Sequence, residues 1–330
     1  MKKLILMIML VAGSITLLFA WGAWGHQHIN RAAVFALPEG LRPLFYNHID
    51  FITEEAVVPD LRKYSINDRA EFPRHFINME SYGPVGSLPR TMQEARAHYA
   101  DTFLTRAGIL PWYMQEMEEK LTKAFKAGRK AEIIFLAADL GHYIGDAHMP
   151  LHTALNHNGQ LTGQQGIHAF WEAQLPEMFG EGYNLYTGDA KYIPDIEEET
   201  WQIVDSTYRL AEVLLAADRE LSAGLPQNKV FMMDSAGHIR TNQFGDLVHT
   251  PEYARKFHEK LHGMIESQLR KAIAKTADFW YTAWVNAGKP VLSGLDPAEL
   301  TERNRNNLQR DLKRWKAGKV DMFRPDKEFK

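Results

Sequence analysis

The chain has 330 residues, of which 45% are hydrophobic and 24% charged, and this composition allows one large domain with a sizeable core but excludes a disordered chain. It contains no cysteine, which excludes disulfide bonds, thiolate catalysis and cysteine-ligated metal, whereas its 14 histidines remain available for chemistry. The formal net charge of −3 by itself indicates neither a nucleic-acid-binding protein nor a polyanion.

The first twenty residues have the pattern of a secretory signal peptide. Lys2 and Lys3 precede an almost wholly apolar run, which ends at Ala20. We therefore expect an exported protein, periplasmic or secreted, whose mature chain begins at Trp21. An uncleaved membrane anchor is the alternative, although an apolar run of about 17 residues is at the lower limit for crossing a bilayer.

Beyond the signal peptide, apolar residues recur at three- or four-residue spacing and predict an all-α fold, a single multi-helix domain over residues 21–290. We expect helices over residues 27–36, 92–126, 131–147, 196–223 and 252–287, with a kink or break near Pro111. Strand signals are weak, and the chain has no glycine-rich phosphate loop, nucleophile elbow or internal repeat.

Residues 291–330 form a basic C-terminal extension and not a second domain. Residues 301–330 hold ten Lys or Arg against five Asp or Glu. Trp315 and Phe323 of this extension are expected to pack on the domain. The alternative is contact of the basic tail with an anionic membrane surface or a partner, and the sequence indicates no obligate protein partner.

The chemistry is concentrated in the middle of the chain. His142 and Asp146 are four residues apart on a predicted helix, which places an imidazole and a carboxylate on one face, where they can bind one metal ion. Pro150 ends that helix and leaves His152 on the following loop. His168 and Glu172 repeat the spacing of four, and with His152 they make a set of two histidines and one carboxylate that is typical of catalytic zinc.

The N-terminal half supplies further candidate ligands. Asp60 and His75 are suited to complete the site begun by His142 and Asp146, and His26 lies five residues after Trp21. His148 is interpreted as a supporting or surface residue. The remaining histidines have no partner pattern and are interpreted as structural.

Together these residues resemble one superfamily, the zinc-dependent phospholipases C and the single-strand-specific zinc nucleases (type I nucleases). The similarity runs from Trp21 to the helix that ends near Ala287. It implies an all-α fold with three Zn²⁺ ions in a cleft. It also implies three ligand sets: Asp60, His75, His142 and Asp146; His152, His168 and Glu172; and the amino group and carbonyl of Trp21 with His26 and a bridging Asp146.

The resemblance further implies hydrolysis of a phosphodiester by metal-activated hydroxide that attacks phosphorus. Asp60 and Asp146 are then catalytic as well as ligating, since Asp60 can orient or deprotonate the attacking water. Lys63 stands where the nucleases carry an arginine, and either it or Arg62 is expected to contact the phosphate.

The substrate remains open between a phospholipid and a single-stranded nucleic acid or nucleotide. Phe76 and Asn78 favour a nuclease or 3′-nucleotidase, because Phe76 can stack on a base and Asn78 can pair with its edge. Glu172 in place of aspartate, and the short spacing from His152 to His168, favour a phospholipase C-like esterase by a slight margin. A non-catalytic, zinc-stabilised surface protein is the alternative from another class.

Overall fold

The structure is a computed structural model that describes residues 22–84, 88–296 and 302–322. These residues form helices and loops without a β-strand, which confirms the all-α prediction. Within them, three isolated β-bridges between residues 231 and 249 are the only extended pairings. The expected signal peptide, Trp21 and Phe323 lie outside the described residues.

The α-helices are α1 (Gly22–Ala36), α2 (Arg42–Asn47), α3 (Ile49–Glu55), α4 (Val58–Tyr64), α5 (Met92–His98), α6 (Asp101–Ala107), α7 (Leu110–Lys126), α8 (Lys130–Ala147), α9 (Ile167–Ala169), α10 (Leu175–Phe179), α11 (Ile196–Ser222), α12 (Gln227–Val230), α13 (Pro251–Lys260), α14 (Met264–Asn286) and α15 (Glu302–Lys316). The 3-10 turns are η1 (Phe72–His75), η2 (Met79–Tyr82), η3 (Pro150–Thr153) and η5 (Gly180–Gly182), and η4 (Phe170–Gln174) is a π-helical turn.

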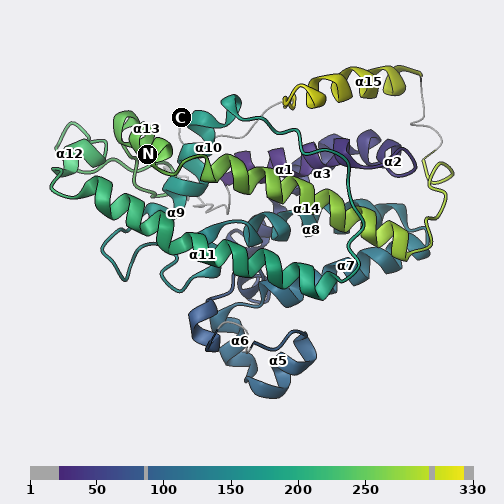
Figure 1. Cartoon of the computed structure of the whole chain (residues 1–330), viewed down its shortest axis with the longest axis horizontal. Coiled ribbons are helices and arrows are strands. Elements are labelled where there is room, and N and C mark those ends of the chain that lie inside the picture. The colour runs from purple at the N-terminus through teal and green to yellow at the C-terminus, as the bar shows by residue number, and fades with distance from the viewer. Residues whose placement is uncertain (1–21, 85–87, 297–301, 323–330) are drawn as a thin grey trace, which may run out of the picture.

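Helix α8 lies at the centre of the packing, against α1, α7 and α14. Its buried positions include every residue from Ala137 to Ala147, as expected for a helix that is covered on all sides. Figure 1 shows α11 and α14 spanning the molecule, with α5 and α6 projecting on one side and α15 lying on the opposite side. The C-terminal end of α8 therefore brings its polar side chains into the interior.

The helices predicted over residues 131–147 and 196–223 are confirmed by α8 and α11. The predicted helix over residues 27–36 is found as α1, but it begins earlier, at Gly22. Among the residues that the structure describes, no helix is long and apolar enough to cross a bilayer.

Two predicted helices are interrupted, the first near the predicted break and also between α5 and α6, and the second where no break was predicted. Residues 92–126 form α5, α6 and α7. Between α6 and α7, Gly108 turns the chain with φ of +88°, and a Cβ at this position would lie 2.1 Å from the carbonyl oxygen of Phe76. Helix α7 then begins with Pro111 in its first turn, close to the predicted break. Residues 252–287 are divided at His262 and Gly263, both of which have positive φ.

The C-terminal extension packs on the domain through its apolar residues. Trp315 of α15 is 1% exposed, and its ring lies 4.7 Å from that of Tyr186 and 6.3 Å from that of Phe35. Upstream, Asp296 binds His48 and Lys130, each at 2.7 Å. The ring contacts of Trp315 and the polar contacts of Asp296 together hold the extension against the helices of the domain.

Candidate metal centre

Four imidazoles meet at the buried carboxylate of Asp146. Its oxygens lie 3.4 Å from Nε2 of His26, 3.0 Å from Nδ1 of His75, 3.2 Å from Nε2 of His142 and 3.3 Å from Nδ1 of His152. Asp146 is 0% exposed. The structure therefore brings together side chains that the sequence separates widely.

Two glycines on α8 allow α1 to approach this carboxylate. A Cβ at Gly141 would lie 2.0 Å from Oδ1 of Asn30, and one at Gly145 would lie 3.0 Å from Nδ1 of His26. Asn30 donates from Nδ2 to the carbonyl of Ala138 at 2.9 Å and so ties α1 to α8. The spacing of small residues on α8 thus places His26 beside Asp146.

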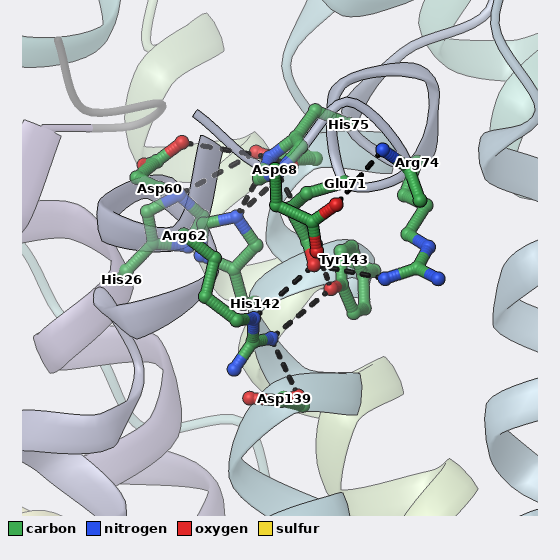
Figure 2. Close-up of polar contacts among 12 residues, drawn as sticks. His26, Asp60, Arg62, Asp68, Glu71, Arg74, His75, Asp139, His142 and Tyr143 are labelled. Atoms are coloured by element: carbon green, nitrogen blue, oxygen red, sulfur yellow. Dashed lines mark hydrogen bonds and ion pairs between the residues drawn. The ribbon is translucent and has the colours of Figure 1, made fainter. Parts of the chain in front are cut away.

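Asp60 and His75 complete the same group from α4 and η1. Nδ1 of His75 lies 3.5 Å from Oδ1 of Asp60 and 3.0 Å from Nε2 of His142 (Figure 2). The ligand atoms of these three residues lie within 4.8 Å of one another, as do those of His26, His142 and Asp146.

A second group lies beside it, formed by His152, His168 and Glu172. Nε2 of His168 is 3.0 Å from Oε1 of Glu172, and Nε2 of His152 is 3.5 Å from Oε2. Glu172 lies in the π-helical turn η4, a geometry that is frequent at functional sites. His152 contacts both groups, because its Nδ1 faces Asp146.

Backbone carbonyls set the orientation of two imidazoles. Nδ1 of His142 donates to the carbonyl of Ala56, and Nδ1 of His168 donates to the carbonyl of His157, each at 2.8 Å. In both rings Nε2 is then left to face the carboxylates, as in histidines that bind metal.

The electrostatics of the centre favour a cation. Burial opposes ionisation of Glu172, but contacts with His168 and His152 hold its pKa at about 2. Burial likewise opposes ionisation of Asp146, and His142 and His152 hold its pKa well below its usual range. Burial lowers the pKa of His152, yet Asp146 and Glu172 raise it to about 10, so the carboxylates attract positive charge strongly.

The donor set also fits a metal ion by its hydrogen bonding. Both ring nitrogens of His26, Oδ1 of Asp146 and Nδ1 of His152 are buried and have no hydrogen-bond partner among the described residues. Burying such atoms unpaired is costly, and a shared cation would satisfy them. Imidazoles and carboxylates are ligands that zinc accepts.

A pocket of about 250 Å³ opens over these groups. Its lining includes four candidate ligands, His75, His152, His168 and Glu172. Its other lining residues are Lys63, Tyr64, Phe72, Phe76, Leu151, His157, Asn158, Ala169 and Asp246. The pocket therefore joins the candidate ligands to aromatic and polar walls.

Only one of the two basic residues predicted to contact phosphate lines this pocket. Lys63 lies in it, with Nζ 4.4 Å from the centre of the Tyr64 ring. Arg62 points into the protein and donates to Asp139 at 2.6 Å and to Glu71 at 3.1 Å. We therefore withdraw Arg62 as a substrate-binding residue.

Phe76 lines the pocket as expected, whereas Asn78 does not, because its Nδ2 lies near the carbonyl of Arg106. His148 is buried away from the pocket and bonded to the carbonyl of Ile144, so it is not a surface residue. His157 was interpreted as structural but lines the pocket.

Sequence reasoning missed Asp246, which comes from the loop between α12 and α13. Its carboxylate accepts a hydrogen bond from Nδ2 of Asn242 at 3.2 Å and lines the pocket. No spacing links Asp246 to the other site residues, so only the fold reveals it.

Comparison with known families places the chain in a described family. A model described as S1/P1 Nuclease matches residues 21–279. A search of curated proteins gives no significant match. The matched span contains both groups of candidate ligands and the pocket, and it ends within α14, before α15.

Proposed function

Because the chain belongs to the S1/P1 nuclease family, whose members are zinc-dependent phosphodiester hydrolases, we propose that it is a nuclease that cleaves single-stranded nucleic acid and 3′-nucleotides. The prediction of a zinc-dependent phosphodiester hydrolase is confirmed, and the non-catalytic alternative is set aside. The slight preference for a phospholipase C-like esterase is not supported, since the family match favours the nuclease alternative.

The observation that carries the proposal is the buried carboxylate of Asp146, shared between imidazoles that face it from several elements. We assign one zinc to Asp60, His75, His142 and Asp146. A second is assigned to His152, His168 and Glu172, and a third to Trp21, His26 and Asp146.

Zinc held by these residues would supply Lewis acidity and would lower the pKa of water from its bulk value to about 7. The carboxylate of Asp60 orients the attacking water and accepts its proton. Lys63 binds the phosphate with its ammonium group. Burial opposes that charge, but Tyr64 and Asp60 raise the pKa of Lys63 above its usual value.

The pocket walls are suited to a nucleobase. Phe76 presents an aromatic ring in the lining of the pocket, and the ring of Phe72 meets it edge-on at 5.2 Å. Stacking on such a ring accepts any base, because every base has a π-face. Asp246 offers a further carboxylate acceptor in the pocket wall, in place of the role predicted for Asn78.

We also propose that the protein is exported and that Trp21 becomes the N-terminal residue. The third ligand set supports this, because a free amino group can bind zinc whereas an amide nitrogen is a poor ligand. N-terminal sequencing of the exported protein tests the cleavage site, and a mature chain that begins at Trp24 would contradict the role of Trp21.

The substrate is tested by parallel assays on a single-stranded oligonucleotide, a 3′-nucleotide and phosphatidylcholine vesicles. We expect cleavage of the first two, and we expect Phe76→Ala to weaken oligonucleotide binding by about 5- to 150-fold, the equivalent of about 1–3 kcal/mol of stacking. Phe51→Ala is the control, because Phe51 is 44% exposed and outside the pocket.

Three outcomes separate the possibilities. Oligonucleotide cleavage that is sensitive to Phe76→Ala supports the proposal. Efficient vesicle hydrolysis without nucleic-acid cleavage would reinstate the phospholipase C-like alternative. A zinc-loaded protein that hydrolyses no phosphodiester would refute the enzymatic assignment for this chain.

A further inference from the structure

A charged network that is partly buried borders the candidate metal centre at His75. It consists of Arg62, Glu71, Arg74, Asp139 and Tyr143, which come from α4, the start of η1 and α8. Figure 2 shows the Glu71 carboxylate between His75 and the guanidinium groups, with Arg62 reaching on to Asp139.

The two oxygens of Glu71 have different surroundings. Oε2 accepts from Nε of Arg62 at 3.1 Å and from Nη1 of Arg74 at 2.9 Å. Oε1 accepts from the hydroxyl of Tyr143 and faces Nε2 of His75 at 3.5 Å. The arginines thus hold the carboxylate in place, and its other oxygen is directed at the imidazole.

His75 has its two ring nitrogens in different environments. Nδ1 faces Asp146 at 3.0 Å and Asp60 at 3.5 Å, within the group assigned to one zinc. Nε2 faces Glu71. With zinc bound at Nδ1, the lone pair of that nitrogen would point to the metal and the ring proton would lie on Nε2, where the Glu71 carboxylate attracts it.

This arrangement differs from that of the other two oriented imidazoles. His142 and His168 donate their far ring nitrogens to neutral backbone carbonyls. His75 faces a charged carboxylate, which makes an imidazole a stronger metal donor than a carbonyl does.

We propose that Glu71 is a positioning residue for His75, and that Arg62, Arg74 and Tyr143 hold it in that role. Glu71 orients the His75 ring and strengthens Nδ1 as a donor to zinc. Arg62, which was expected from the sequence to contact phosphate, instead holds the Glu71 carboxylate in place. The proposal rests on the proposed zinc site, but its test does not depend on the substrate.

The alternative is that Glu71 only neutralises Arg62 and Arg74. The contacts argue against this, because Asp139 already pairs with Arg62 at 2.6 Å and because Oε1 is used by neither arginine. A carboxylate that served only the arginines would not need an oxygen directed at the ring of His75.

The test compares Glu71→Gln and Glu71→Leu in the full mature chain. Glutamine keeps an acceptor oxygen and removes the charge, and leucine removes both. Zinc affinity is measured by competition with a chelator, and the visible spectrum of the cobalt-substituted protein reports the ligand field. We expect affinity to fall in the order wild type, glutamine, leucine, with a loss of about 10- to 100-fold for leucine.

Glu118→Gln and Glu118→Leu are the matched controls. Glu118 is also a buried glutamate, 7% exposed, but its partners are Thr122 and Asn286. We expect these variants to lower the stability of the metal-free protein and to leave zinc affinity and the cobalt spectrum unchanged. A purely structural role for Glu71 predicts the same behaviour for both glutamates.

Zinc affinity within about threefold of wild type in both Glu71 variants would overturn the proposal, because loss of such a supporting contact weakens binding more than this. If Glu71→Leu does not fold, Tyr143→Phe replaces it. That variant removes one donor to Oε1, and we expect a smaller loss of affinity, whereas an unchanged affinity and cobalt spectrum would count against the proposal. Wild-type protein that binds no zinc would instead refute the proposed metal site.

Discussion

Asp146→Asn is the substitution that tests the metal centre most directly. Asparagine has nearly the same shape as aspartate, so the packing at the end of α8 is preserved. It carries no charge, however, and it presents an N–H₂ group to imidazoles that face a carboxylate in the wild-type protein. The perturbation therefore removes one property, the negative charge shared by the proposed ligand sets.

The magnitude follows from the charged interactions that the substitution removes. A hydrogen bond or comparable interaction with a charged group contributes about 1.5–3 kcal/mol. If two ions share Asp146, the affinity decreases by about 3–6 kcal/mol in total, or about 10²- to 10⁴-fold in combined zinc affinity. We expect at least one zinc to dissociate at stoichiometric metal and activity to fall by about a hundredfold or more.

The assay measures zinc content, zinc affinity and cleavage of a single-stranded oligonucleotide. Asp218→Asn is the matched control, since Asp218 is also buried and accepts hydrogen bonds from Tyr253 and Gln164 outside the centre. The shared role of Asp146 is refuted if Asp146→Asn keeps its full zinc content and retains activity within about tenfold of wild type, a change of about 1.4 kcal/mol.

Three further predictions address the packing and the pH dependence. Gly145→Ala places a Cβ 3.0 Å from Nδ1 of His26, so we expect the free energy of unfolding to fall by about 1–3 kcal/mol and the zinc assigned to His26 to be lost. Gly182→Ala is the control, because its Cβ meets nothing within 4 Å, and it should change neither the zinc content nor the melting temperature. Equal zinc content in both variants would be contrary evidence. Burial lowers the pKa of His249 from 6.5 to about 3, so stability is fully present above pH 6.5 and falls by up to about 1.4 kcal/mol per pH unit as the pH drops from 6.5 toward 3. Urea unfolding of metal-free wild type and His249→Gln measures this contribution, and identical pH dependence would show that it is absent. Trp315→Ala removes a ring that is 1% exposed, so we expect the free energy of unfolding to fall by about 3–5 kcal/mol with zinc content unchanged, and a loss of zinc would mean that the extension supports the metal centre.

The local spacing of ligands was readable from the sequence because a helix places residues i and i+4 on one face. His142 and Asp146 lie on α8 and face the same group, as the spacing predicts. The distant partners were not readable in this way. Their placement depends on packing between helices, so the sequence offered His26, Asp60 and His75 only as candidates, and the family resemblance assigned them to ligand sets.

The direction of the Arg62 side chain could not be predicted, because α4 was not recognised as a helix. Asp60 and Lys63 are three residues apart, so they lie on one face, directed at the centre and the pocket. Arg62 lies off that face and reaches Glu71 and Asp139. A helix of seven residues is too short to give a clear periodic signal.

The break between α13 and α14 was hidden for a different reason. Phe257, Leu261 and Ile265 keep a spacing of four across it, and all are buried. The apolar pattern therefore continues although the backbone does not. Gly263 was the only local sign, and a single glycine is not sufficient to end a predicted helix.

The shared carboxylate of Asp146 also has a consequence for the folding kinetics. Its partners come from α1, η1 and η3, so most of the centre is built from residues that are distant in the chain and costly to bring together in loop-closure entropy. In an unfolded chain only local pairs such as His168 and Glu172 can hold a metal ion together. A complete ligand set around Asp146 therefore forms only after α1 has docked on α8.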